Sequence, residues 1–197
     1  MAGKPLSESV AKLYFRYSAM NAGKSTALLQ VAHNYEEYGR RVELFTSAID
    51  DRFGVGTITS RLGPSRAATI FDSAFDFYEH VANHRDLSCL LVDEAQFLME
   101  SQVRQLHQVA HSVDIPAICY GIRSDFLGVA FPGAAALLTL ADSIEEIKTV
   151  CACGKKATMN PRYDENDRRI VSGEQIAIEG KARYRQVCGS CFYSDLP

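Results

Sequence analysis

The residues best suited to chemistry begin with a run of small side chains, Ser18-Ala-Met-Asn-Ala-Gly-Lys-Ser-Thr26. The run matches the phosphate-loop pattern G-x-x-x-x-G-K-[ST], except that Ser18 stands at the first glycine position. Between a strand and a helix N-terminus, the backbone N–H groups of such a loop form a cup for anions. Gly23 would let the backbone approach phosphate, Lys24 would reach the outer oxygens, and the Ser25 hydroxyl would bind Mg²⁺. We predict that Ser18 keeps a negative φ and does not itself hold the phosphate.

A pair of carboxylates ends an apolar run in Cys89-Leu-Leu-Val-Asp93-Glu94. A phosphate-loop protein places the carboxylate that holds Mg²⁺, usually through water, after such a strand, which is where Asp93 stands. Glu94 would project at the carboxyl edge of the same sheet, where ligands of open α/β folds bind. It could there accept a proton from a substrate hydroxyl as a general base. Two acids that cap a strand are common by themselves, so this prediction depends on the phosphate loop.

Four of the six cysteines form two close pairs, Cys151-Ala-Cys153 and Cys188-Gly-Ser-Cys191. Zn²⁺ prefers four soft ligands in a tetrahedron, and each close pair can supply two of them from a tight turn. Disulfides are not expected in a chain without an export signal. We therefore predict a structural zinc site, with redox dithiols and free thiols as the alternatives. Cys89 and Cys119 stand alone in apolar runs and should be buried as small hydrophobic side chains.

Two histidine pairs, His80 with His84 and His107 with His111, have i, i+4 spacing on expected helices. Neither pair encloses the glutamate of an H-E-x-x-H motif, and neither is expected to have a third ligand nearby. We therefore expect solvated or hydrogen-bonded histidines rather than metal ligands.

An alternation of strands and helices should position these groups. Apolar runs predict strands at residues 13–17, 41–46, 89–93, 116–120 and 144–150. Helical periodicity predicts helices at residues 24–39, 71–82, 98–112 and 134–141. The Gly-, Ser- and Thr-rich segment 50–64 should form loops or a flexible hairpin. The alternation predicts an α/β core with a mostly parallel sheet.

The tail changes character after the core and carries a cysteine pair at each end. We divide the chain into a flexible N-terminus (residues 1–12), a nucleotide-binding core (residues 13–150) and a small zinc-binding domain (residues 151–197).

The composition is typical of a soluble globular protein, since 47% of the 197 residues are hydrophobic, 23% are charged and the net charge is −3. No apolar run approaches the roughly 20 residues of a membrane span. The N-terminus lacks the apolar core of a signal peptide. We therefore expect a cytoplasmic protein without a membrane partner. The negative charge also gives no general electrostatic reason to bind nucleic acid.

Taken in order, the motifs resemble those of the thymidine kinases of the cellular and bacterial type. The resemblance runs from about Leu13 to Phe192 and rests on these segments: Ser18–Thr26, Asp50-Asp-Arg-Phe-Gly54, Val92-Asp-Glu-Ala-Gln-Phe97, Gly121-Ile-Arg-Ser-Asp-Phe126 with Phe131, and the cysteine pairs with Tyr184. It implies a P-loop NTPase (RecA-like) core with a zinc-bearing C-terminal lobe. It also implies transfer of the ATP γ-phosphate to the 5′-hydroxyl of thymidine, and of deoxyuridine, which gives dTMP and ADP for nucleotide salvage and DNA synthesis.

The resemblance also implies roles for individual residues. Glu94 would be the base on the 5′-hydroxyl, while Lys24 and Arg52 would neutralise charge that develops during transfer. Ser25 would bind Mg²⁺ directly, with Asp93 in its outer shell. ATP would contact Ser18, Ala19, Met20, Asn21, Ala22, Gly23, Lys24, Ser25, Thr26, Asp93 and Gln96. Zinc would be bound by Cys151, Cys153, Cys188 and Cys191.

The nucleoside pocket would draw on Met20, Phe97, Ile122, Phe126, Phe131 and Tyr184. A lasso loop between the cysteine pairs would close over the base, and its main chain would contact the base at Ile176, Ala177 and Ile178. By analogy with the family, the chain would form a homotetramer, and dTTP would act as a feedback inhibitor.

Two other functions remain open from the sequence. A zinc-containing P-loop ATPase that acts on nucleic acid should have a basic, aromatic-rich surface and motor motifs, whereas this chain is negatively charged. A non-catalytic nucleotide sensor stabilised by zinc would not need a carboxylate at the position of Glu94.

Overall fold

The computed structural model describes residues 11–49, 56–84, 86–176 and 183–194. Six strands form one central sheet in the order β5-β2-β6-β7-β1-β8. Every pairing between neighbouring strands of this sheet is parallel, as predicted. The strands are β1 (Leu13–Tyr17), β2 (Val42–Ser47), β5 (Thr69–Phe71), β6 (Cys89–Val92), β7 (Ala117–Gly121) and β8 (Ser143–Glu146).

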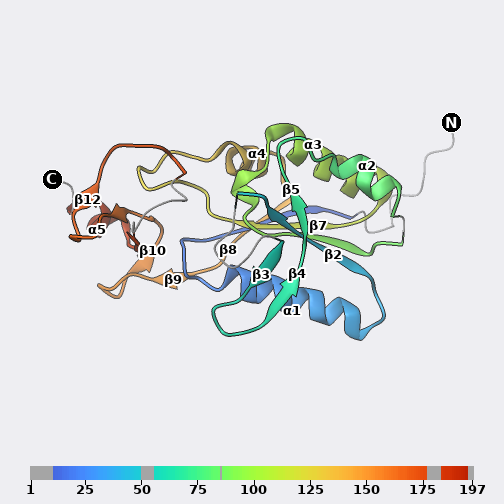
Figure 1. Cartoon of the computed structure of the whole chain (residues 1–197), viewed down its shortest axis with the longest axis horizontal. Helices are drawn as coiled ribbons and strands as arrows, with labels where there is room; N and C mark the ends of the chain where they lie inside the picture. The colour runs from blue at the N-terminus through green and yellow to red at the C-terminus, as the bar shows by residue number, and fades with distance from the viewer. Residues whose placement is uncertain (1–10, 50–55, 85, 177–182, 195–197) are drawn as a thin grey trace.

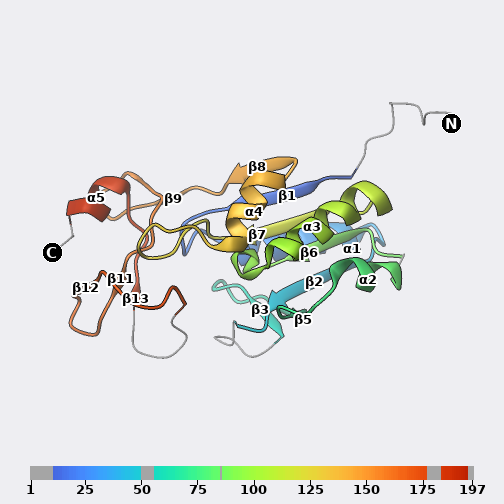
Figure 2. The same ribbon diagram turned by 90° about the horizontal axis from the view of Figure 1, so that it is seen from above.

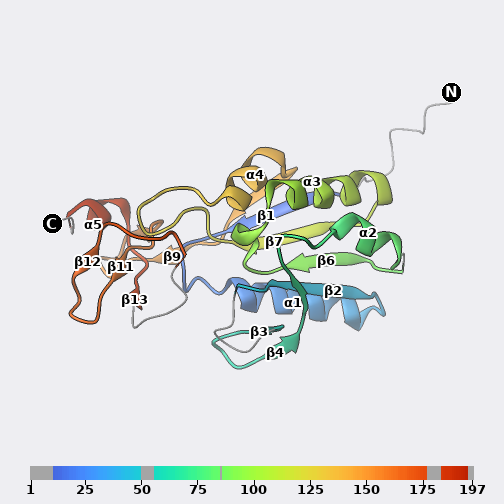
Figure 3. The same ribbon diagram turned by 45° about the horizontal axis from the view of Figure 1, so that its top comes forward.

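Helices cover both faces of the sheet (Figures 1 and 3). Helix α1 (Lys24–Glu37) lies on one face together with the hairpin of β3 (Thr57–Thr59) and β4 (Ser65–Ala67). The other face carries α2 (Phe77–Ala82), α3 (Glu100–Gln108) and α4 (Pro132–Leu140). A 3₁₀ turn, η1 (Ala95–Phe97), precedes α3, and a π-helical turn, η2 (Val109–Val113), follows it.

The central strands explain why their sequences are apolar without interruption. In β6, Leu90 and Val92 belong to the core under α2, α3 and α4, whereas Cys89 and Leu91 belong to the core under α1. Successive side chains of a strand point to opposite faces, so a strand covered on both sides buries every residue. Cys89 and Cys119 are fully buried, as the sequence predicted.

Gly133 in α4 allows an unusually close approach between elements. A Cβ atom at this position would lie 2.5 Å from the carbonyl oxygen of Leu98 and 2.9 Å from those of Ala95 and Gln96. Only glycine can therefore bring α4 this close to η1. The contact fixes the turn that carries Gln96 and Phe97.

The C-terminal lobe lies beyond the carboxyl ends of the strands, at the end of the molecule toward which β1 runs (Figures 1 and 2). It contains the antiparallel pair of β9 (Thr149–Val150) and β10 (Lys156–Ala157) and a three-stranded sheet in which β11 (Arg162–Tyr163) lies between β12 (Arg169–Ile170) and β13 (Arg183–Tyr184). The chain ends in α5 (Gly189–Ser194). In the described part of the chain, no helix combines the length and the apolar character that a membrane span requires.

Three predicted elements were wrong in part. The segment 71–82 is not one helix, because β5 ends at Phe71 and α2 begins only after Asp76, whose carboxylate accepts the N–H of Glu79 and caps the helix. The segment 98–112 is divided between α3 and η2. The segment 144–150 is not one strand, since β8 ends at Glu146 and β9 belongs to the separate sheet of the lobe.

Candidate active site

The phosphate loop connects β1 to α1 at the carboxyl edge of the sheet. Gly23 caps α1 with a φ of 81° and accepts the N–H of Ala27 at 2.9 Å. This left-handed conformation, together with the φ of 62° at Asn21, bends the chain into the helix N-terminus. Ser18 is buried and has no positive φ, so its position is open to an L-residue, as predicted.

Lys24 lies folded back on the start of the loop. Its Nζ donates to Ser18 Oγ at 3.1 Å and to the carbonyl oxygen of Ala19 at 3.2 Å. Ser18 Oγ in turn donates to the Ala19 carbonyl oxygen at 2.7 Å. The serine that replaces the first glycine therefore holds the lysine ammonium group, a contact that the sequence alone did not indicate.

Asp93 and Ser25 form the part of the site that can accept a cation. Ser25 Oγ donates to Asp93 Oδ2 at 2.8 Å, and the backbone N–H of Glu94 donates to Asp93 Oδ1 at 3.0 Å. Burial, followed by the charge of Glu94, raises the pKa of Asp93 to about 7. A hydroxyl and a buried carboxylate are oxygen donors that fit Mg²⁺, which prefers oxygen ligands.

The raised pKa predicts how stability depends on pH without Mg²⁺ or nucleotide. Between about pH 4 and about pH 7 the folded chain keeps a proton on Asp93 that the unfolded chain has lost. This contribution to stability is therefore complete at low pH and is lost as the pH rises through about 7. Urea titrations would give the free energy of unfolding of the wild type and of Asp93→Asn at each pH. We expect the difference, wild type minus variant, to fall as the pH rises from about 4 to about 7. A difference that stays constant, or that rises with pH, would contradict the assignment.

Gln96 orients the Glu94 carboxylate. Its side-chain nitrogen donates to Glu94 Oε2 at 2.5 Å, and its side-chain oxygen accepts the N–H of Ile122 at 3.2 Å. Glu94 itself has a φ of 50°, a left-handed conformation that costs energy for a residue other than glycine. Strain of this kind is often found at functional sites. The sequence assigned Gln96 to nucleotide binding, whereas its amide here contacts the candidate base.

A cavity of about 860 Å³ brings most of the predicted residues together. The predicted residues that line it are Met20, Asn21, Ala22, Gly23, Lys24, Ser25, Thr26, Glu94, Gln96, Phe97, Ile122, Phe126, Phe131, Ile176 and Tyr184. Ser18, Ala19 and Asp93 do not line the cavity themselves. Ser18 and Ala19 accept hydrogen bonds from Lys24, and Asp93 accepts one from Ser25; both donors line the cavity. Arg52, Ala177 and Ile178 lie outside the described residues.

The C-terminal lobe completes the cavity through direct contacts with the core. Asn160, which is 3% exposed, accepts the backbone N–H of Met20 on its side-chain oxygen at 2.7 Å. The Gln175 amide donates to Asp125 at 3.0 Å. The Arg162 guanidinium lies 3.7 Å from the centre of the Phe126 ring, within the range of a cation–π contact.

The four paired cysteines converge in the lobe. The Sγ atoms of Cys153 and Cys151 are 3.5 Å apart, those of Cys153 and Cys188 are 3.6 Å apart, and the four sulfur atoms all lie within 4.8 Å of one another. Tetrahedral zinc with Zn–S bonds of about 2.3 Å needs sulfur atoms about 3.8 Å apart. The four thiols therefore fit a zinc ion.

The pKa values of these thiols also favour a bound cation. The N–H groups of Cys153 and Cys188 lower the pKa of Cys151 to about 6. The three neighbouring cysteines raise the pKa of Cys191 to about 12. A cation at the centre would allow all four sulfur atoms to be thiolates.

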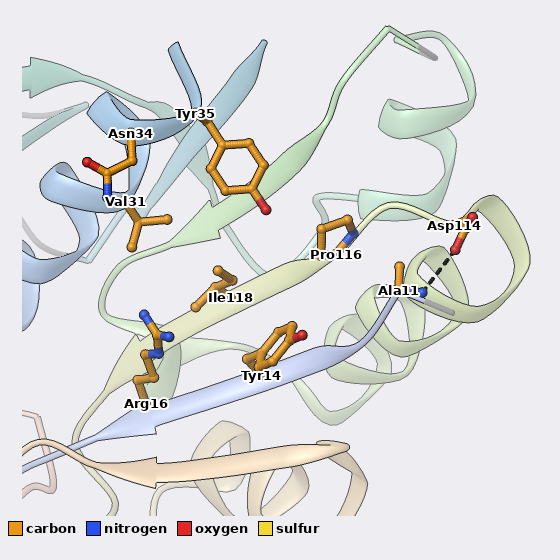
Figure 4. A pocket seen from close by; sticks show the side chains of 9 residues that line it. All are labelled: Ala11, Tyr14, Arg16, Val31, Asn34, Tyr35, Asp114, Pro116 and Ile118. Atoms are coloured by element: carbon orange, nitrogen blue, oxygen red, sulfur yellow. Dashed lines mark hydrogen bonds between the residues drawn. The ribbon is translucent and has the colours of Figure 1, made fainter. Parts of the chain in front are cut away.

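A second hollow of about 550 Å³ lies between the sheet and α1, near the amino ends of β1 and β7 (Figure 4). Its lining is Ala11, Tyr14, Arg16, Val31, Asn34, Tyr35, Asp114, Pro116 and Ile118. Arg16 donates to the Tyr120 hydroxyl at 2.8 Å, and Asp114 accepts the N–H of Ala11 at 2.9 Å. None of the residues with predicted chemistry lines this hollow, so the larger cavity is the candidate active site.

Comparison with known proteins agrees with this geometry. The profile of the family described as thymidine kinase matches residues 11–192. This chain belongs to the thymidine kinase family. It is 58% identical to a thymidine kinase of Chromobacterium violaceum over 94% of this chain and 100% of that protein. It is 55% identical to one of Albidiferax ferrireducens, over 94% of each chain, and 50% identical to one of Yersinia pseudotuberculosis, over 91% of this chain and 93% of that protein.

In this member of the thymidine kinase family, the cavity also has lining residues that sequence reasoning missed. They are Ile49, Thr59, Ser60, Arg61, Leu62, Ser124, Asp125, Asn160, Gln175 and Arg183. Ser60 hydrogen-bonds to Thr26 of the phosphate loop, with 2.6 Å between the hydroxyl oxygens. Ile49 follows β2, and the others come from the β3–β4 hairpin, the connection after β7 and the lobe. Ser124 and Asp125 lie inside the Gly121–Phe126 segment that carries the family resemblance, whereas the other eight belong to no motif and are found only from their place in the fold.

Proposed function

We propose that the chain transfers the γ-phosphate of Mg-ATP to the 5′-hydroxyl of thymidine, and of deoxyuridine, with dTMP and ADP as products. One observation carries this proposal: a single cavity is lined by the phosphate loop, by Glu94 and by a wall of aromatic side chains. A thymine ring is flat and apolar on its faces, so such a wall fits it. Membership of the thymidine kinase family supports the same substrate.

The transfer requires alignment and charge neutralisation rather than covalent help from the protein. The 5′-oxygen attacks the γ-phosphorus, the bond from that phosphorus to the β–γ bridging oxygen breaks, and ADP leaves. Glu94, held by Gln96, takes the proton of the 5′-hydroxyl. Lys24 exchanges its contacts with Ser18 and Ala19 for phosphate oxygens. Ser25 would hold Mg²⁺ directly and Asp93 would hold it through its outer shell, and the ion would supply charge neutralisation at the phosphates.

Arg52 is proposed, from the family resemblance, to neutralise charge on the transferred phosphoryl group. The nucleoside is proposed to contact Met20, Ile122 and Tyr184 and to lie under a lasso loop that includes Ile176 and the neighbouring Ala177 and Ile178. Closure of that loop would keep water from the phosphoryl group.

The zinc-binding domain is proposed to be structural. Four thiolates leave no open coordination position, and zinc would fix the stems of the loop that carries Asn160 and Gln175 over the cavity. The division into residues 1–12, 13–150 and 151–197 belongs to the same proposal. By family resemblance, we also propose a homotetrameric, cytoplasmic enzyme of nucleotide salvage with feedback inhibition by dTTP.

Asn160 provides a test of how the lobe acts on the cavity. Asn160→Ala removes the acceptor of the Met20 N–H, and a lost hydrogen bond of this kind costs about 0.5–1.5 kcal/mol. We expect the KM for thymidine to rise by about 2- to 13-fold while the bound zinc is retained. Steady-state kinetics would measure this, with Asn166→Ala, an exposed position in the same lobe, as the control. Equal KM values for the two variants would show that the Met20 contact does not shape the site.

The proposed activity can be tested with zinc-replete protein, Mg-ATP and thymidine. We expect ADP release that requires thymidine, and a similar dependence on deoxyuridine. ADP release that is independent of nucleoside and rises with single-stranded DNA would instead support an ATPase that acts on nucleic acid. If the protein released no ADP under any of these conditions, it would not catalyse the transfer, and the proposal would be contradicted.

A further inference from the structure

A cluster outside the candidate active site brings together two imidazoles and one carboxylate. His107 lies in α3 and His111 in η2, and their ring centroids are 4.4 Å apart. His111 Nε2 lies 3.1 Å and 3.0 Å from the two carboxylate oxygens of Asp142, in the connection between α4 and β8. One donor atom of each of the three residues lies within 4.8 Å of the others.

This arrangement corrects the expectation that the His107–His111 pair has no third ligand nearby. Asp142 is 31 residues from His111 in the sequence, so spacing along one helix could not reveal it.

We propose that His107, His111 and Asp142 form a binding site for a divalent transition-metal ion such as Zn²⁺, Ni²⁺ or Cu²⁺, separate from the four-cysteine site. Imidazole nitrogen and carboxylate oxygen are common ligands of these ions, whereas Mg²⁺ and Ca²⁺ prefer oxygen donors alone. Tetrahedral coordination with bonds of about 2.0–2.2 Å places donor atoms about 3.4 Å apart. His111 Nε2 lies 3.0 Å from Asp142 Oδ2, and all three donors lie within 4.8 Å of one another, so the cluster is near that spacing.

The carboxylate is held in place by the fold rather than by the histidine alone. The backbone N–H of Leu13 donates to Asp142 Oδ2 at 2.8 Å, and the N–H of Asp142 donates to the Leu13 carbonyl oxygen at 2.9 Å. Outer-shell hydrogen bonds of this kind orient metal ligands and are part of a built site. The side chains of His111 and Asp142 are 37% and 24% exposed, so an ion can reach them from solvent.

The position of the cluster indicates what the ion would do. A metal at this site would join the end of α3 to the amino end of β1, whereas the phosphate loop follows the carboxyl end of that strand. None of the three residues lines the cavity of the candidate active site. Because the site exists only in the folded chain, the ion should stabilise the fold and leave turnover unchanged.

The proposal can be tested with the untagged full-length protein, its cysteine site loaded with zinc. After weakly bound metal is removed on a chelating resin, the protein is dialysed to equilibrium against micromolar Zn²⁺ and the bound zinc is measured. We expect two zinc ions per chain for the wild type and one for His107→Gln and for His111→Gln. We also expect added Zn²⁺ to raise the melting temperature of the wild type but not of these variants.

His84→Gln is the matched control, because His84 stacks on His80 with ring centroids 4.5 Å apart, and within the described residues that pair belongs to no three-ligand group. This control should bind two ions. Asp142→Asn keeps an acceptor for the Leu13 N–H and should bind one. The proposal is overturned if the wild type binds one ion, or if both His107→Gln and His111→Gln, shown to be folded by circular dichroism, still bind two.

Discussion

Glu94→Gln should lower turnover by about 10²-fold or more, the usual scale for the loss of a general base. Glutamine keeps the size of the side chain and can still accept the Gln96 hydrogen bond, but it cannot take a proton from the 5′-hydroxyl. The phosphate loop is unchanged, so the affinity for Mg-ATP should stay close to that of the wild type. Single-turnover kinetics and equilibrium binding of ATP measure the two effects separately.

Glu100→Gln is a suitable control, since Glu100 lies exposed in the first turn of α3, where it forms an ion pair with Arg104 one turn later. It should leave turnover unchanged. If Glu94→Gln retained more than about a tenth of the wild-type turnover, Glu94 would not be the base.

Cys188→Ser should release the zinc and destabilise the C-terminal lobe. Removal of one of four thiolates leaves an incomplete tetrahedron, and structural zinc sites supply a large part of the folding free energy of small domains. We expect a loss of at least about 3 kcal/mol and a fall in melting temperature of about 6–12 °C. The KM for thymidine should rise as well, because Asn160, Gln175 and Tyr184 reach the cavity from this lobe.

Metal analysis, thermal unfolding and steady-state kinetics would be compared with those of Ser190→Ala. Ser190 is an exposed neighbour between Cys188 and Cys191, so its replacement should preserve both zinc and stability. A Cys188→Ser protein with one tightly bound zinc and the wild-type melting temperature would rule out a structural four-cysteine site.

The central sheet could be predicted because its strands are simple in sequence. The run from Cys89 to Val92 is entirely apolar, and every residue in it is buried between two helical layers. The phosphate loop was equally clear, since a strand, a Gly-Lys-Ser triplet and an amphipathic helix occur in that order. Local patterns of this kind fix both the element and its place at the carboxyl edge of a parallel sheet.

Contacts between distant segments could not be predicted in the same way. The bond from Met20 to Asn160 spans 140 residues, and no periodicity links the two positions. The helix expected over residues 71–82 was wrong at its start because the Asp76 cap outweighs the apolar pattern that precedes it. The role of Ser18 as the partner of Lys24 also depends on how the loop closes in space.

The identity of the phosphorylated product tests the central claim most directly. The protein would be incubated with Mg-ATP and either thymidine or 5′-deoxythymidine, and the products would be examined by phosphorus NMR. We predict thymidine 5′-monophosphate and ADP from thymidine, and no phosphorylated nucleoside from the analogue that lacks the 5′-hydroxyl. Phosphate at the 3′-position, phosphorylation of 5′-deoxythymidine, or inorganic phosphate as the sole product besides ADP would contradict the account.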